Sequence, residues 1–442
     1  MELRQSLKWH ILYLLKGCGM MKRYYPRIAD TLLKNSLESS GAVLIEGPKW
    51  CGKTRTASEM ANSVLYMQDP DTRESNMQAA NIKPSLLLQG QVPRLIDEWQ
   101  VAPILWDAVR HEVDRRGEEG QFILTGSVTP VMDEKISHTG TGRISRVKMR
   151  PMSLFESNES SGDISLGDVF NHEAEISSIS KLEIEDIAQA IVRGGWPASV
   201  TSKFGSAAKR AQDYVDSVVN FDVAMVDRVE KNQSKMFALL RSLARNVSTE
   251  AKNSVIMKDM EGGENESITY PTIQSYLNVL QRLFVIEDLE AWNPSIRSAT
   301  PLRISPKRHF VDPSIACASL GINHAQLLGD FNTFGYMFES LCIRDLRVYT
   351  EAIGGKVYHY RDKNGLECDA VIVLRDGRWG AVEIKLGANE FDKASRNLQS
   401  LEAIIDTEKM NHPSFLMIVT GSKLGYRRDD GVLIVPIGCL RN

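Results

Sequence analysis

The sequence predicts a multidomain α/β protein, and three observations support this fold class. A chain of 442 residues is longer than one ordinary core, because single hydrophobic cores stop growing at roughly 250–300 residues. Apolar runs of strand length alternate with helical patterns between residues 42 and 127, which is typical of a parallel sheet covered by helices. Further strand-like runs follow a helical pattern after residue 330, and they predict a separate C-terminal α/β domain.

Composition and charge limit the class of protein. Hydrophobic residues make up 43% and charged residues 25% of the chain, which is near the average for soluble globular proteins. A net charge of -3 gives no bulk attraction to nucleic acid or anionic lipid, so such binding requires a local patch. The six cysteines show no CxxC spacing and favour a reducing compartment. We therefore expect a cytoplasmic protein. Because no apolar span of membrane length is present, we expect no membrane partner.

Residues 1–20 are expected to be an N-terminal extension. The apolar stretch Trp9–Leu15 is short, contains His10 and lacks a small-residue cleavage site, so it does not fit a signal peptide. The alternative is a short amphipathic helix before the basic stretch that begins at Lys22.

The first α/β domain is expected over residues 21–160. Its first strand is the apolar run at 42–46, which ends at a glycine. Two further strands are predicted at 94–98 and 121–127, separated by an amphipathic helix at 103–116.

A glycine-rich motif joins the first strand to a helical pattern. Residues 47–54 match G-x-x-x-x-G-K-[ST]. In such a loop the glycines let backbone amides turn toward phosphate, the lysine reaches the β and γ groups, and the hydroxyl ligates magnesium. The motif therefore predicts ATP and Mg²⁺ as ligands of an ATP-hydrolysing enzyme. The expected binding residues are Gly47, Pro48, Lys49, Trp50, Cys51, Gly52, Lys53, Thr54 and Arg55.

Polar residues at the ends of the next strands are expected to complete this site. Asp97 would hold magnesium through water, and Glu98 would orient or activate the attacking water. The alternative is an ordinary strand end capped by acids. Thr125 and Ser127 end the following strand and are candidates for sensing the γ-phosphate.

Two arginines are candidates for stabilising the charge that develops during hydrolysis. Arg143 and Arg146 would do so within the chain or from a neighbouring subunit, and surface arginines are an equally good interpretation.

The middle of the chain is expected to be helical. Residues 158–163 are rich in Ser, Glu, Asn and Gly, which marks the end of the first domain near residue 160. A helical lid is expected over 161–230. A winged-helix-like domain is expected over 231–325, because a helical pattern at 272–284 precedes a strand-like run at 285–289. Four basic residues near this region suit DNA binding, although winged helices also serve as protein-interaction or packing modules: Arg297, Arg303, Lys307 and Arg308.

Several of these motifs occur together in one family. The Tyr-Tyr-Pro-Arg segment at 24–27, the GPKWCGKT loop, LIDEWQ, ILTGS, GRISRVKMRPMSLFE and the RGGWP turn resemble the uncharacterised AAA-type P-loop ATPases common in bacteria and archaea. Residues 305–312 resemble the strand at the junction between that family's domains. The resemblance implies an AAA+-like parallel sheet, a winged-helix region and a C-terminal domain of unknown function (DUF4143).

The C-terminal domain, expected over residues 326–442, combines three acids and a lysine. Glu339 lies on a predicted helix, Asp369 enters a strand, and Glu383 and Lys385 lie on the next strand. The period of two in a strand places Glu383 and Lys385 on one face. Glu339, Asp369 and Glu383 are then candidate metal ligands, and Lys385 would position water.

This arrangement resembles the restriction-endonuclease-like fold of the PD-(D/E)xK nucleases. Glu383 and Lys385 would be catalytic in such a site. The alternative is an exposed strand of mixed charge, because E-x-K is a short motif. Tyr358, Tyr360 and Arg361 would stack on nucleic acid, but we favour packing for them.

Two functions from different classes are consistent with the sequence. The first is an ATP-hydrolysing switch or motor whose nucleotide state controls a metal-dependent nuclease-like domain acting on DNA. The second is an ATP-dependent regulatory or scaffold protein with an inactive C-terminal domain that binds nucleic acid or protein. DNA and a second copy of the chain are the partners left open. A transporter-type ATPase or a metabolic kinase is not favoured, because the sequence shows neither a phosphoryl-acceptor site nor a membrane span.

Overall fold

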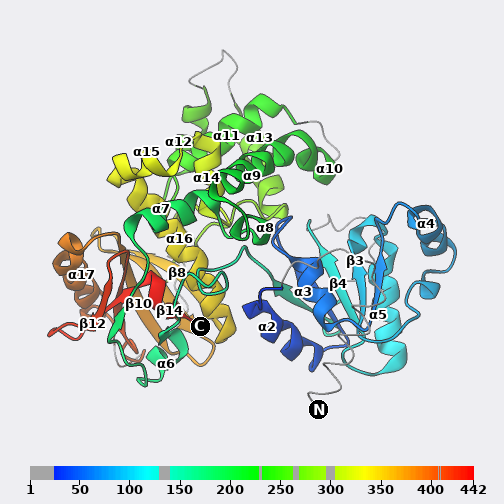
Figure 1. The fold of residues 1–442 in the computed structure, drawn as a ribbon, viewed down its shortest axis with the longest axis horizontal. Coiled ribbons are helices and arrows are strands. Elements are labelled where there is room, and N and C mark those ends of the chain that lie inside the picture. Colours follow the sequence, from blue (N-terminus) through cyan, green and yellow to red (C-terminus); the bar gives the residue numbers. More distant parts are fainter. Residues whose placement is uncertain are drawn as a thin grey trace.

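The computed structural model describes residues 24–128, 140–227, 231–261, 268–294, 304–406, 408 and 410–442. Figure 1 shows three bodies: a blue and cyan α/β domain on the right, green and yellow helices at the top, and an orange and red α/β domain on the left. The yellow helix α16 (Phe331–Ala352) descends from the helical region along the C-terminal sheet. Arg297 and Arg303 lie outside the described residues.

The N-terminal domain is built on a five-stranded sheet in the order β2-β3-β4-β1-β5, and all its pairings are parallel. Its strands are β1 (Ala42–Glu46), β2 (Ser63–Tyr66), β3 (Arg94–Asp97), β4 (Phe122–Gly126) and β5 (Ile144–Lys148). Its helices are α2 (Ile28–Leu37), α3 (Lys53–Met60), α4 (Arg73–Ile82) and α5 (Ile104–Arg116). The parallel sheet, its predicted strands and the helix at 103–116 are therefore confirmed.

The central strands of this sheet are apolar because both of their faces are covered. Residues on β1 alternate between two cores, since successive side chains of a strand point to opposite faces. Ala42 and Leu44 join the core that contains Trp99 and Trp106, and Val43 and Ile45 join the larger core on the opposite face. β1 is thus held firmly at the strand end from which the glycine-rich loop leaves.

The middle of the chain is mainly helical. Its helices are α7 (Ile184–Arg193), α8 (Pro197–Val200), α9 (Phe204–Ser217), a π-helix at Val218–Asp222, α10 (Val223–Asp227), α11 (Gln233–Arg245), α12 (Asn253–Glu261), α13 (Tyr270–Arg282), α14 (Pro313–Leu320) and α15 (His324–Gly329). The segment before α7 instead contains α6 (Leu166–Phe170) and two short strands, β6 (Ile164–Ser165) and β7 (Ser178–Ile179). β6 pairs with β14 (Leu440–Arg441), and β7 pairs with β12 (Leu424–Arg427). The first part of the expected lid therefore belongs to C-terminal sheets.

A short antiparallel connection follows α13. Isolated bridges join Ile286 to Phe310 and Leu289 to Lys307, and a parallel bridge joins Ala291 to His359 on β8 (Gly355–Arg361). The strand-like run predicted at 285–289 therefore forms bridges at the edge of the C-terminal sheet. We call residues 285–292 and 304–311 together the junction segment.

The C-terminal domain has a mixed seven-stranded sheet in the order β7-β12-β13-β11-β10-β9-β8. The strands not yet described are β9 (Glu367–Leu374), β10 (Trp379–Lys385), β11 (Leu416–Thr420) and β13 (Leu433–Pro436). α16 and α17 (Phe391–Ala403) contact this sheet. The helix predicted around Glu339 and the two strands predicted at Asp369 and at Glu383 and Lys385 are confirmed as α16, β9 and β10.

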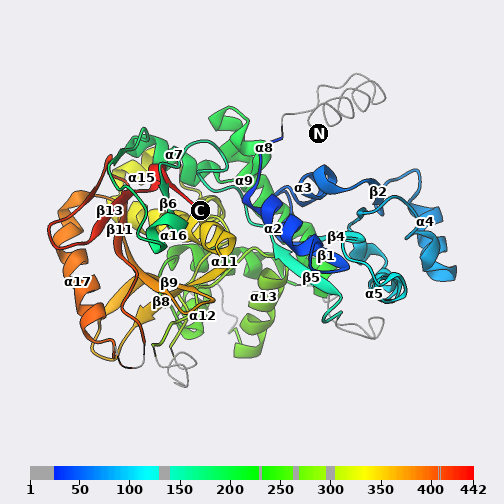
Figure 2. The same cartoon turned by 90° about the horizontal axis from the view of Figure 1, so that it is seen from below.

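Figure 2 shows that α2 lies beside the N-terminal sheet and faces the middle of the molecule. It contacts both β5 and α16, so it links the two α/β domains. Across the described residues, no helix combines the length and the apolar character needed to cross a membrane.

Candidate nucleotide site and C-terminal acid cluster

The glycine-rich loop connects β1 to the first turn of α3. Lys53 is buried, and its Nζ atom donates to the carbonyls of Gly47 and Pro48 at 2.9 and 2.7 Å. The ammonium is therefore held against the loop at the N-terminus of a helix, where backbone N–H groups and the helix dipole favour an anion.

Two glycines of the loop occupy positions that other residues do not fit. A Cβ atom on Gly47 would lie 2.0 Å from the carbonyl oxygen of Met149. Gly52 has a φ of 105°, a conformation that glycine adopts without strain. The sequence requirement for glycine at both positions thus has a steric cause.

The strand ends beside the loop bring the predicted acids and hydroxyls together. Asp97 Oδ1 accepts hydrogen bonds from Thr54 Oγ1 at 2.7 Å and from Thr125 Oγ1 at 2.6 Å. A hydroxyl and a carboxylate in contact are a donor set of the kind that Mg²⁺ prefers. These contacts place Thr54 and Asp97 together, as expected for residues that would hold magnesium.

Glu98 lies next to Asp97 in a left-handed backbone conformation, with a φ of 56°. Its carboxylate accepts a hydrogen bond from Ser127 Oγ at 2.9 Å and another from the amide of Gln100. Its N–H donates to Thr125 Oγ1 at 3.1 Å. A non-glycine residue in this conformation costs free energy, so it persists only where surrounding contacts stabilise it. The three hydrogen bonds provide this stabilisation and fix the position of the Glu98 carboxylate.

The two candidate arginines form ion pairs with residues outside the loop. Arg143 precedes β5, and the partner of the adjacent Ile144 is Ala42, at the start of β1. The loop follows the other end of β1. Arg143 pairs with Asp114 at 2.8 Å, and Arg146 pairs with Glu46 at 2.9 Å. The structure therefore does not bring Arg143 to the site predicted for it.

Residues outside the predicted site also contact the loop. Arg27 is buried and donates to the carbonyl of Cys51 at 2.8 Å. Lys49 pairs with Asp222 of the π-helix at 2.5 Å, and the Trp50 ring lies 5.7 Å from the ring of Tyr214. The Tyr-Tyr-Pro-Arg motif signals Arg27, whereas Asp222 has no local signal because it lies 173 residues from Lys49.

A cavity of about 320 Å³ adjoins the loop. It lies between the start of α3, the segment before α2 and the turn that begins α8. Arg55 also lies over the Tyr24 ring, 5.6 Å from its centre. The lining residues are Tyr24, Tyr25, Arg27, Gly52, Arg55, Thr56, Met152, Pro197, Ala198 and Thr201. This combination of an apolar lining and a few polar groups is typical of small-molecule sites.

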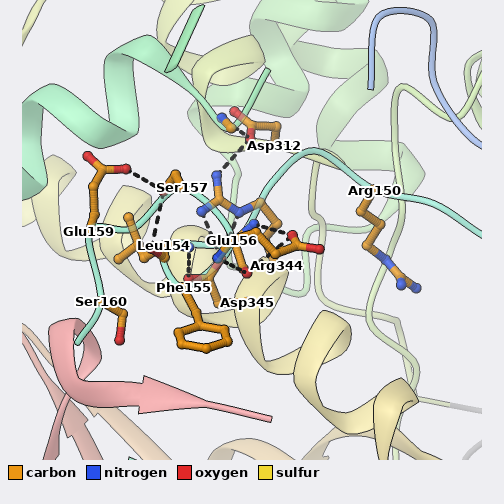
Figure 3. A network of polar contacts seen from close by, with 12 residues as sticks. Arg150, Leu154, Phe155, Glu156, Ser157, Glu159, Ser160, Asp312, Arg344 and Asp345 are labelled. Carbon is orange, nitrogen blue, oxygen red and sulfur yellow. Dashed lines mark hydrogen bonds and ion pairs between the residues drawn. The ribbon is translucent and has the colours of Figure 1, made fainter. Parts of the chain in front are cut away.

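A buried polar network lies between the N-terminal domain and α16 (Figure 3). The Arg344 side chain pairs with Asp312 at 2.9 Å and with Asp345 at 2.7 Å. Asp345 also accepts a hydrogen bond from the backbone N–H of Leu154 at 2.9 Å. Glu156, in the same loop as Leu154, pairs with Arg27 at 3.1 Å. Polar contacts on either side of the connection at 153–156 therefore link the glycine-rich loop to α16.

The four C-terminal candidates also come together. Lys385 Nζ lies 2.9 Å from Asp369 Oδ2 and 2.6 Å from Glu383 Oε2. The N–H of Ile384 donates to Asp369 at 2.9 Å. Glu339 on α16 reaches the same place, and we call Glu339, Asp369 and Glu383 the acid cluster.

Lys307 of the junction segment enters the acid cluster. Its Nζ atom lies 2.9 Å from Glu339 Oε1 and 3.0 Å from Asp369 Oδ1. From its sequence context, Lys307 is a candidate cation for DNA binding or part of a packing module, and in the structure it is buried. A lysine among the buried residues His309, Phe310 and Val311 is the signal that would have indicated an internal partner.

Burial and neighbouring charges shift the pKa values in the cluster. Burial raises the pKa of Glu339 to about 7, although Lys307 opposes this. Burial and the charge of Asp369 raise the pKa of Glu383. Burial also acts to raise the pKa of Asp369, but Lys307 and Lys385 hold it below its usual value. Asp369 is therefore the carboxylate most firmly ionised.

The arrangement does not fit the metal ion predicted from the sequence. The Lys307 ammonium lies between Glu339 and Asp369, where an ion bridging these two acids would have to bind. Among the residues that the structure describes, no three His, Cys, Asp or Glu side chains are arranged to hold a metal ion. The buried Lys307 ammonium, and not a metal ion, therefore neutralises Glu339 and Asp369 in this structure.

Comparison with protein families divides the chain into three parts. Residues 39–158 match an AAA domain. Residues 184–326 match one domain of unknown function (DUF8612), and residues 334–440 match another (DUF4143). The chain thus contains an AAA domain of the P-loop ATPase class, followed by two domains without an assigned function.

Two mycobacterial proteins match most of the chain, and two archaeal ATPases are similar to part of its structure. An uncharacterized protein of Mycobacterium tuberculosis and one of Mycobacterium bovis are each 23% identical over 423 residues, covering 95% of this chain and 85% of each relative. A Walker-type ATPase of Pyrococcus abyssi is similar in structure, with 14% identity, a TM-score of 0.42, and coverage of 69% of this chain and 98% of that one. A signal-transduction ATPase of Pyrococcus horikoshii gives 12% identity, a TM-score of 0.22, and coverage of 75% and 50%.

Proposed function

We propose that the protein is an ATP-hydrolysing switch, in which the nucleotide at the glycine-rich loop controls how the AAA domain engages the helical and C-terminal domains. The observation that carries this function is the contact of Asp97 with Thr54 and Thr125 beside the buried Lys53. Together these residues supply the anion site, the magnesium ligands and an adjacent carboxylate that P-loop hydrolysis requires.

Each residue has a separate role. Lys53 and the loop amides bind the phosphates, and Thr54 and Asp97 would hold magnesium, which supplies charge neutralisation when it is bound. Glu98 positions and deprotonates the attacking water, because its carboxylate is held by Ser127 and Gln100. The Thr125 hydroxyl forms hydrogen bonds with the Asp97 carboxylate and with the backbone N–H of Glu98. It therefore fixes the positions of the two acids relative to each other.

The cavity beside Gly52 suits the nucleoside. It adjoins the loop, and the Tyr24 and Tyr25 rings offer apolar surfaces for a base. Pro197 and Ala198 of the RGGWP turn form the opposite wall. A nucleoside bound there would touch both the AAA domain and the helical region, which is the geometry that a nucleotide switch requires.

The output is proposed to be regulatory. Arg27, Glu156 and the Arg344 network connect the loop to α16, and Lys307 pairs with Glu339 and Asp369, two of the three acids predicted to bind a nuclease metal. These contacts favour a regulatory or scaffold protein over the alternative of a metal-dependent nuclease.

ATP turnover by purified full-length protein tests the assignment. Lys53→Ala should weaken nucleotide binding, whereas Glu98→Gln should retain binding and lower turnover by about 10²-fold or more. Lys83→Ala, on a residue beyond α4 and away from the loop, is the control and should behave as wild type. Normal turnover by Glu98→Gln, or turnover unaffected by Lys53→Ala, would contradict the assignment.

A further inference from the structure

The acid cluster contains a cation from another part of the chain. Lys307 is separated from Asp369 by 62 residues and lies at the edge of the domain that carries the acids. Its side chain is only 6% exposed. An ammonium at this depth requires partners, because an unpaired buried charge is very costly. Glu339 and Asp369 are those partners.

The charges of the cluster are close to balance without any added ion. Three carboxylates, of Glu339, Asp369 and Glu383, face the two ammonium groups of Lys307 and Lys385. A divalent ion bound by Glu339 and Asp369 would have to lie about 2.0–2.6 Å from their oxygens. The Lys307 ammonium already lies between the same two oxygens, and a second cation there would be repelled.

We propose that Lys307 replaces a divalent metal ion in the acid cluster, so that the cluster acts as a clasp that holds the junction segment to the C-terminal domain. The occupant of the site is therefore an internal cation, and the partner of the C-terminal domain at this place is the chain itself. This inference goes beyond the proposed ATPase function and holds whether or not ATP is hydrolysed.

The backbone around Lys307 explains why a clasp is needed. The junction segment is joined to its surroundings through isolated bridges, such as the pair between Lys307 and Leu289 with N–O distances of 2.9 and 2.8 Å. Isolated bridges lack the additional hydrogen bonds that a continuous ladder would provide, so they are only weakly stable on their own. The ion pairs of Lys307 add a tertiary attachment at the same point.

The junction segment also touches the other two domains. Arg308 pairs with Asp288 at 2.5 Å and donates to Asn253 at 2.6 Å, at the start of α12. Glu287 pairs with Lys148 and Arg150 of the AAA domain, both at 2.7 Å. A clasp at Lys307 therefore fixes a segment that contacts all three parts of the molecule.

Manganese titration without nucleotide tests the occupancy. Electron paramagnetic resonance of the full-length wild type should show no bound Mn²⁺ beyond that of Asp369→Asn. Lys307→Ala should gain one bound Mn²⁺ per chain, and adding Asp369→Asn should abolish that gain. Lys307→Arg keeps the positive charge and should bind no more Mn²⁺ than wild type.

Hydrogen exchange tests the clasp independently. Amides in residues 304–311 should exchange at least tenfold faster in Lys307→Ala and in Asp369→Asn than in wild type, whereas Lys363→Ala, on an exposed residue of the same domain, should leave them unchanged.

Three results would overturn the inference: Mn²⁺ binding by wild type that Asp369→Asn removes, no Mn²⁺ gained by a folded Lys307→Ala variant, or unchanged exchange of residues 304–311. If both variants fail to fold, Mn²⁺ titration of Asp97→Asn decides, because this variant lacks the magnesium ligand proposed in the AAA domain: one bound Mn²⁺ per chain that remains in Asp97→Asn would show that a metal ion occupies the acid cluster.

Discussion

Arg27 and Glu156 form a buried ion pair, with 3.1 Å between the Arg27 Nε atom and Glu156 Oε1. The same guanidinium donates to the carbonyl of Cys51 in the glycine-rich loop. Glu156 in turn accepts hydrogen bonds from the N–H groups of Ile28 and Ser153, both at 2.8 Å. The pair therefore holds the loop, α2 and the 150–160 connection in one arrangement.

Arg27→Ala is expected to destabilise the protein strongly. Removing one member of a buried ion pair leaves the other charge buried and unpaired, at a cost of roughly 3–5 kcal/mol. Thermal unfolding should show a midpoint several degrees lower. The control is Lys209→Ala, which removes the exposed ion pair with Asp213 on α9 and should leave the midpoint unchanged. Equal midpoints for the two variants would contradict the structural role of Arg27.

Gly47→Ala is expected to lower ATP affinity by more than tenfold. The added Cβ atom would lie 2.0 Å from the Met149 carbonyl, so the loop must move away from β5 and its amides lose their alignment. Isothermal titration with a non-hydrolysable ATP analogue measures the change. Gly205→Ala, on α9 with no neighbouring atom within 4 Å of its added Cβ, should bind as wild type. Wild-type affinity in Gly47→Ala would remove the steric explanation.

Asp222→Asn is expected to strengthen ATP binding by about threefold to tenfold, which corresponds to roughly 0.7–1.4 kcal/mol. The Asp222 carboxylate pairs with Lys49 of the loop, and removing its negative charge both frees this ammonium and reduces repulsion of the phosphates. The same titration measures the effect. Asp213→Asn removes an exposed carboxylate of the neighbouring helix α9 and should change nothing. Weaker binding by Asp222→Asn would mean that the pair supports the loop instead of competing with nucleotide.

His359 is expected to make the fold sensitive to acid. Burial, aided by Lys307, lowers its pKa from 6.5 to about 4. Because the unfolded chain takes up the proton first, the stabilising contribution is present above pH 6.5 and is lost as the pH falls toward 4. Its size is of the order of 3 kcal/mol, at 1.36 kcal/mol for each pH unit.

Thermal unfolding between pH 7.5 and 5 measures this dependence. His359→Gln should flatten the fall in midpoint, whereas His412→Gln, whose side chain is 73% exposed, should keep the wild-type slope. A wild-type slope in His359→Gln would show that other groups cause the acid sensitivity.

Much of the fold could be predicted from the sequence because its signals are local. The bounds of β1, β4 and α5 agree with those expected from the sequence to within about one residue. Buried parallel strands are recognisable as short apolar runs, and α5 as the amphipathic stretch between two of them. The approach of Asp369, Glu383 and Lys385 followed from the period of two in β10 and from the short connection between β9 and β10.

The remaining features depend on contacts between distant residues, which no local pattern encodes. β6 and β7 are two-residue strands that exist only because C-terminal strands pair with them. From the sequence, Arg143 is a candidate catalytic arginine. The parallel register instead places it beside the start of β1, at the opposite end of the strand from the glycine-rich loop. The residues that follow Lys307 indicate that this lysine is buried, but its partners Glu339 and Asp369 could be identified only from the fold.

Hydrogen exchange of the full-length protein with and without a non-hydrolysable ATP analogue tests the switch most directly. The switch predicts slower exchange in the loop and in residues 204–222, together with a change in the junction segment at 304–311. None of these changes should occur in Lys53→Ala. Protection confined to the AAA domain, with identical exchange at 204–222 and 304–311 in the bound and free protein, would contradict control of the other domains by nucleotide.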